Sequence, residues 1–185
     1  MWYVIQTITG KEQELVEAVH RMIPKKVYKE CFFMKRQLLK RLGGEWLEVT
    51  ETLFPAYVFL DTEEPDLLFY ELKRVPEFSK LLGDNQGMFI PLEESECVFL
   101  QKLLGICGEE KEERPFAADG RFLVKITRVW LDNTGAVKRL AGPLEAFRGK
   151  ILRMNLRKRY AIVETPMRGE IQTAMLGIKL EKDPV

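Results

Sequence analysis

Histidine and cysteine, from which most metal sites are built, are scarce in this chain. Its 185 residues include one histidine, His20, and three cysteines, Cys31, Cys97 and Cys107. The cysteine count is odd and no Cys-x-x-Cys spacing occurs, so the sequence indicates neither a disulfide framework nor a zinc site. We expect free thiols, no bound metal and no cofactor.

Long apolar runs are also missing. No stretch approaches the about 20 apolar residues that span a bilayer, and the N-terminus lacks the basic segment that opens a signal peptide. Hydrophobic residues make up 46% of the chain and charged residues 31%, which is typical of a soluble globular protein. We therefore expect a cytoplasmic protein with no membrane contact.

Recognisable catalytic motifs are absent as well. No phosphate-binding loop occurs, and the pair Gly43 and Gly44 is too short to form one. Nothing in the pattern resembles an activated nucleophile, and the carboxylates are spread over expected helix starts and a charged linker. We predict that the protein is not an enzyme.

Charge, in contrast, is abundant and unevenly divided. Residues 120–185 hold 14 Lys and Arg against 6 Asp and Glu, a net charge of +8, whereas residues 1–119 carry a net charge of −7. Such asymmetry suggests that the C-terminal part meets a polyanion and that the rest does not. A generally basic, solvated surface is the alternative.

The first hundred residues alternate strand and helix patterns. The apolar period of helices is found in 11–23, 65–74 and 91–104. Strands are expected at 2–9, 27–42, 45–53, 58–60 and 88–90, with a hairpin turn at Gly43 and Gly44. This mixture predicts an α+β layer.

Beyond Gly105 the pattern changes. Residues 106–119 are rich in charge and poor in large apolar residues, and are predicted to be a flexible acidic linker. From Gly120 onward no helical period occurs. Short strands are expected at 121–131, 136–140, 150–154, 160–164, 171–176 and 178–180. Several short strands with regular turns predict a small β-barrel.

Several motifs within this series of predicted strands and helices resemble those of the NusG family of transcription elongation factors. The opening strand Trp2-Tyr3-Val4-Ile5-Gln6 and the loop Phe54-Pro55-Ala56-Tyr57 are similar to the family's NGN domain, although the family usually has glycine where Ala56 stands. Residues 142–164, with Gly142, Phe147 and Gly149, resemble the KOW motif. The resemblance implies an NGN domain at 1–105, with an antiparallel sheet and flanking helices, a linker at 106–119, and an all-β KOW barrel at 120–185.

The resemblance also implies a contact with RNA polymerase through an exposed apolar patch. The residues expected there are Phe54, Pro55, Tyr57, Trp2 and Tyr3. An aromatic-proline loop can offer rigid contact area at low entropic cost. From the residues alone, anchoring of the next strand in the core is the preferred interpretation of Phe54 and Tyr57.

Within the family, the basic C-terminal part is most similar to the specialised antitermination paralogue LoaP, which implies binding of a nascent RNA hairpin. The candidate RNA-binding residues are Lys138, Arg139, Arg148, Lys150, Arg153, Asn155, Arg157, Lys158, Arg159 and Arg168. Cations would meet phosphate, and Asn155 and Tyr160 could meet unpaired bases.

Other roles stay open at this point. The hairpin cations could meet upstream DNA, although a solvated hairpin is the preferred interpretation; they are Lys35, Arg36, Lys40 and Arg41. Phe147 matches the position by which the family contacts the ribosome, or it closes the barrel core. A monomeric general elongation factor whose KOW domain contacts the ribosome or a termination factor is the main alternative function. A ribosomal or assembly protein with a structural KOW domain is a third.

Overall fold

The computed structural model describes residues 1–76, 78, 89–105 and 121–183. The predicted linker at 106–119 and Cys107 lie outside these residues. In the described part, no helix has both the length and the apolar character needed to cross a membrane.

The N-terminal sheet has the strand order β3-β2-β4-β1-β5. Its strands are β1 (Trp2–Gln6), β2 (Glu30–Leu42), β3 (Glu45–Thr52), β4 (Tyr57–Asp61) and β5 (Phe89–Pro91). Neighbours along this path are antiparallel. The helix α1 (Glu12–Met22) packs against β2 and β4 through its buried side chains Leu15, Val16, Ala18 and Val19. The shorter α2 (Pro65–Leu72) buries Leu68 and Leu72.

Strand β2 is long enough to serve two sheet regions. Its first residues pair with β4, and its second half pairs with β3 across the turn at Gly43 and Gly44. Between them, β6 (Arg121–Val124) joins β2 in parallel. The first strand of the C-terminal part thus belongs to the N-terminal sheet.

The C-terminal sheet has the strand order β8-β7-β11-β10-β9. Its strands are β7 (Thr127–Leu131), β8 (Val137–Ala141), β9 (Ile151–Asn155), β10 (Tyr160–Met167) and β11 (Glu170–Leu180). The sheet curls around one apolar core, and a 3-10 segment, η2 (Pro143–Lys150), crosses from β8 to β9. This is the KOW-type barrel that the sequence predicted.

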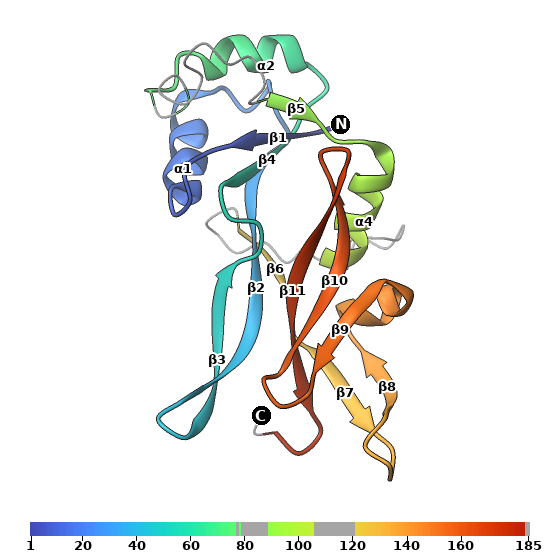
Figure 1. The fold of residues 1–185 in the computed structure, drawn as a ribbon. Coiled ribbons are helices and arrows are strands. Elements are labelled where there is room, and N and C mark those ends of the chain that lie inside the picture. Colours follow the sequence, from blue (N-terminus) through green and yellow to red (C-terminus); the bar gives the residue numbers. More distant parts are fainter. Residues whose placement is uncertain (77, 79–88, 106–120, 184–185) are drawn as a thin grey trace.

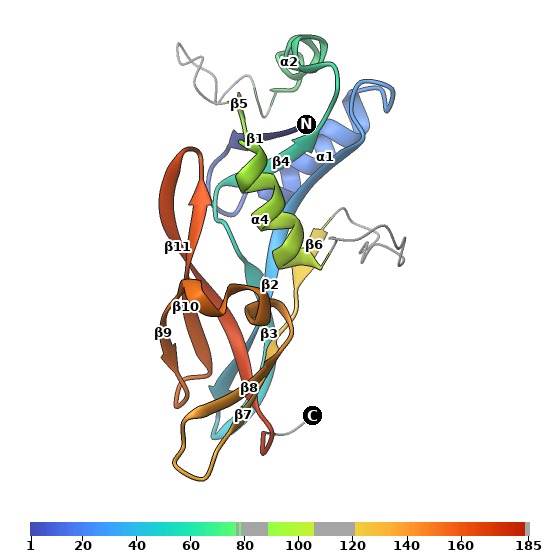
Figure 2. The same cartoon turned by 90° about the vertical axis from the view of Figure 1, so that its right-hand side faces the viewer.

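The two halves share a hydrophobic cluster. It joins Phe32, Phe59 and Leu100 of the N-terminal part to Leu144 and Leu176 of the barrel. The helix α4 (Glu94–Leu104) contacts β10 and η2, and the long β11 contacts β2. Figures 1 and 2 show the barrel lying along β2 and α4 rather than standing apart from them.

The predicted fold class is confirmed, with local differences. Strand β2 starts at Glu30 rather than at residue 27, and α4 starts at Glu94 because Glu93 and Glu96 form a reciprocal capping box there. The sequence predicted a turn and then a strand from Lys150, whereas the chain forms η2 first. Leu144 and Phe147 are both buried, and the segment is kinked at Phe147, whose φ of −117° is not helical.

Candidate nucleic-acid interface and aromatic loop

The aromatic-proline loop forms a tight turn between β3 and β4. The Tyr57 amide donates to the Phe54 carbonyl at 3.2 Å, and Ala56 has a φ of 68°. Proline followed by a positive-φ residue is the pattern of a type II turn, where glycine is preferred. The Ala56 amide donates to the carboxylate of the buried Glu12 at 2.7 Å, which ties the loop to the start of α1.

The five residues predicted to bind polymerase are exposed to different degrees. Pro55 is exposed and Tyr57 is half-buried, whereas Phe54, Trp2 and Tyr3 are buried. Phe54 packs edge-on against Phe59. In this arrangement the loop presents Pro55 and part of Tyr57, and Phe54 anchors it.

The turn between β10 and β11 lies beside this loop. The Arg168 guanidinium is 5.9 Å from the centre of the Tyr57 ring, and its Nη1 donates to Gln6 at 3.1 Å. The Gly169 amide donates to a carboxylate oxygen of Glu96 at 2.8 Å, while the other oxygen of Glu96 caps α4. Arg168 is therefore separated from the other predicted RNA-binding residues and contacts the N-terminal half.

The cations of the β2–β3 hairpin have partners within the protein. Lys40 and Arg36 both pair with Glu51, and Arg36 also donates to the Met175 carbonyl at 2.8 Å. Arg41 donates to the Gly44 carbonyl at 3.0 Å. The hydrogen bond from Lys40 is the main cause that lowers the pKa of Glu51. These contacts favour a structural role for the hairpin cations.

Most of the predicted RNA-binding cations are exposed on the barrel. They are Lys138 and Arg139 on β8, Arg148 and Lys150 on η2, Arg153 on β9, and Arg157 and Lys158 in the β9–β10 turn. Within the described residues, none of these seven forms an ion pair. The 3-10 segment η2 contacts both β8 and β9, which brings the first five onto adjoining elements.

Two predicted residues have structural contacts instead. Arg159 is 8% exposed, has a φ of 59° and donates to both carboxylate oxygens of Asp183 at 2.6 Å. Burial alone would raise the pKa of Asp183, but the bonds from Arg159 and from the Leu180 amide lower it below its ordinary value. The Asn155 side chain accepts a hydrogen bond from the Lys158 amide at 2.8 Å and so shapes the turn.

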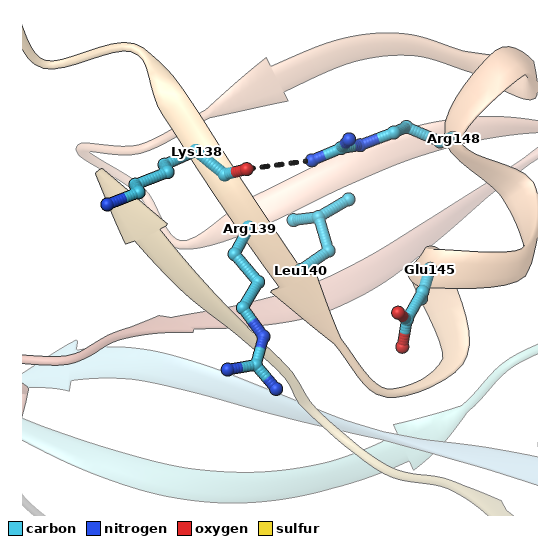
Figure 3. Close-up of a pocket in the computed structure, with 5 residues that line it drawn as sticks. All are labelled: Lys138, Arg139, Leu140, Glu145 and Arg148. Carbon is cyan, nitrogen blue, oxygen red and sulfur yellow. Dashed lines mark hydrogen bonds between the residues drawn. The ribbon is translucent and has the colours of Figure 1, made fainter. Parts of the chain in front are cut away.

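A pocket of about 200 Å³ lies between β8 and η2. Its lining consists of Lys138, Arg139, Leu140, Glu145 and Arg148 (Figure 3). Arg148 reaches across to the Lys138 carbonyl at 3.3 Å. Arg139 and Arg148 thus line one hollow of the cation-rich surface, whereas the Lys138 side chain points away from it.

Phe147, the candidate for ribosome contact, is 4% exposed and lies 4.5 Å from the ring of Phe99 in α4. The structure thus places it between the two halves. The sequence patterns did not single out Trp130, whose ring lies 4.9 Å from the Arg139 guanidinium. Alternation along β7 was the available signal, since Thr127 and Val129 are buried whereas Arg128 is exposed and Trp130 half-buried.

Comparisons with known proteins agree on one family. The sequence model described as transcription termination factor nusG matches residues 1–101. The transcription termination/antitermination proteins NusG of Helicobacter pylori strains 26695 and J99 are 26% and 25% identical over 100 residues. These matches cover 51% of this chain and 56% of each relative, so they span about half the length of the curated proteins.

A solved structure described as "Domain interaction in Thermotoga maritima NusG" is 19% identical, with a TM-score of 0.48 over 95% of this chain and 92% of that one. The match of the family's sequence model to more than half of the residues decides the assignment. The chain belongs to the NusG family of transcription termination factors.

Proposed function

We propose that this protein is a monomeric, cytoplasmic transcription elongation and antitermination factor of the LoaP type. In this proposal Pro55 and Tyr57 contact RNA polymerase, and the barrel binds a nascent RNA hairpin. The supporting observation is the set of seven exposed barrel cations that form no ion pair within the described residues. Three of the hairpin cations, by comparison, are held by Glu51 or by backbone carbonyls, and we assign them no DNA contact; they are Arg36, Lys40 and Arg41.

RNA binding is tested by salt dependence. Removing one phosphate contact should reduce the slope of log affinity against log salt by about 0.7–0.9. We expect Arg157→Ala with Lys158→Ala to weaken binding of the full chain to the leader hairpin identified by sequencing the RNA captured with the protein, and to flatten this slope. The matched control, Lys40→Ala with Arg41→Ala, removes two charges from the β2–β3 hairpin and should change little. Equal affinity for scrambled RNA would reject specific recognition.

Polymerase binding is tested at Tyr57, since Phe54→Ala would open a cavity in the core. We expect Tyr57→Ala to weaken capture of RNA polymerase, and Tyr70→Ala, which removes a 64% exposed tyrosine from α2, to leave it unchanged. Equal capture by both variants would reject the role of the loop.

The general elongation factor is the competing function. In that case polymerase captured with this protein would carry transcripts from across the genome. An antiterminator of the proposed type would instead give transcripts from one or a few leaders. Sequencing of the RNA that is captured with the protein separates these outcomes.

A further inference from the structure

The outer surface of the β7–β8 hairpin carries an ordered pair of side chains. Trp130 and Arg139 are directly opposite each other in the antiparallel register. The guanidinium of Arg139 lies 4.9 Å from the centre of the Trp130 ring, and Arg139 remains exposed. A tryptophan ring holds an arginine by cation–π attraction and stacking. Trp130 therefore restricts the orientation of the Arg139 guanidinium.

The held guanidinium lines the pocket between β8 and η2. Figure 3 shows Arg139 and Glu145 extending to the same side of the pocket, whereas Lys138 points the other way. Leu140, which is buried, supplies an apolar wall. Arg148 closes one side by its bond to the Lys138 carbonyl at 3.3 Å. The pocket thus combines a planar cation, an apolar surface and a carboxylate.

This combination is poorly suited to a bare phosphate. The Glu145 carboxylate would repel a phosphate oxygen, but it can accept a hydrogen bond from the amino group of a base. Arginine planes stack on unpaired bases in RNA recognition. The flanking cation Arg148 is placed to meet an adjacent phosphate.

We infer that the pocket receives one unpaired nucleobase of bound RNA, stacked on Arg139, with its exocyclic amino group donating to Glu145. This inference rests on the proposed RNA-binding function and adds base selectivity to it. Cytosine, which has an amino group at this edge, should be preferred over uracil, which has a carbonyl there.

The test compares oligocytidylate with oligouridylate of equal length, each titrated into the full chain. We expect oligocytidylate to bind about tenfold more tightly, because a good base-edge contact discriminates by about 5- to 150-fold. Glu145→Ala should make the affinities for oligocytidylate and oligouridylate equal, whether or not both affinities change. Arg139→Lys keeps the charge but loses the plane, and should weaken oligocytidylate about tenfold. The control Arg128→Lys makes the same change on β7 outside the pocket and should have little effect.

Equal binding of the two oligomers by the unaltered protein, or no difference between Arg139→Lys and Arg128→Lys, would overturn the inference. The leader hairpin, measured in parallel, distinguishes this failure from a failure of the proposed function. If hairpin binding depends on Arg157 and Lys158 but no base preference is found, the proposed RNA-binding function is supported and the base pocket is rejected. Absence of binding to either RNA rejects both.

Discussion

Gly177 of β11 crosses the β2 backbone at Gln37 with no room for a side chain. A Cβ at Gly177 would lie less than 3.0 Å from the Gln37 carbonyl oxygen and 3.1 Å from the Cα of Leu38. The requirement for glycine here comes from this close approach of two backbones. Beside the crossing, Arg36 donates to the Met175 carbonyl and Lys179 pairs with Glu48, so the same region is also held by polar contacts.

Gly177→Ala should therefore push β11 away from β2. Because the obstructing atoms belong to backbone, neither strand can yield by a change of rotamer. We expect the free energy of unfolding to fall by about 1–3 kcal/mol, the usual cost of overpacking. Urea denaturation measures this change. Gly149→Ala is the matched control, since no atom lies within 4 Å of its Cβ position and its φ is not positive; equal losses in the two variants would contradict the steric account.

The backbone is locally strained at Ala56. Its φ of 68° lies in the left-handed region, which costs an alanine about 1–2 kcal/mol more than a glycine. We expect Ala56→Gly to raise the free energy of unfolding by about 0.5–1 kcal/mol, after the greater chain entropy of glycine is included. The effect is readable as a higher melting temperature. Ala146→Gly, in η2, should lower stability instead, and a decrease in both variants would show that Ala56 is not strained.

The sequence predicted the order of strands and helices well because periodicity and turn residues act locally. Residues 1–101 also carry family motifs, and the charge division marks the basic barrel. These features need only neighbouring residues to be recognised.

Contacts between distant residues were the part that could not be predicted. The sequence pattern does not distinguish the three consecutive cations Arg157, Lys158 and Arg159. Of these, only Arg159 is buried, because the β10–β11 hairpin brings Asp183 next to it. The exposure of the aromatic loop likewise depends on the barrel, which lies far along the chain. A site formed from both halves becomes visible only when their packing is known.

The pair of Arg159 and Asp183 makes stability sensitive to acid. The folded pKa of Asp183 lies below its unfolded value of about 3.9. The stabilisation is thus complete above the unfolded pKa and is lost as the pH falls through the folded pKa.

We expect Asp183→Asn to cost about 3 kcal/mol or more near neutral pH, because it leaves a buried guanidinium without its counter-charge. The variant should also lose less stability than the parent protein between about pH 5 and about pH 2. Urea midpoints near neutral pH and over this acid range check the two effects. Glu181→Gln, at an exposed position nearby, should keep the acid dependence of the parent; an unchanged slope in Asp183→Asn would refute this assignment.

Substitution of Arg168 distinguishes the proposed polymerase contact from the proposed RNA contact. It contacts Tyr57 and Gln6 and lies apart from the exposed barrel cations. If Tyr57 binds polymerase as proposed, Arg168→Ala should expose the Tyr57 ring. Polymerase binding should then tighten about two- to fivefold, which is the equivalent of one exposed cation–π contact. Affinity for the leader hairpin should stay within about twofold, whereas Arg157→Ala should weaken it because a phosphate then has no cation to meet.

Titrations of both variants with polymerase and with RNA give the comparison. A decrease of RNA affinity in Arg168→Ala equal to that in Arg157→Ala would return Arg168 to the RNA-binding surface, and weaker polymerase binding would mean that Arg168 supports the polymerase contact instead of covering it.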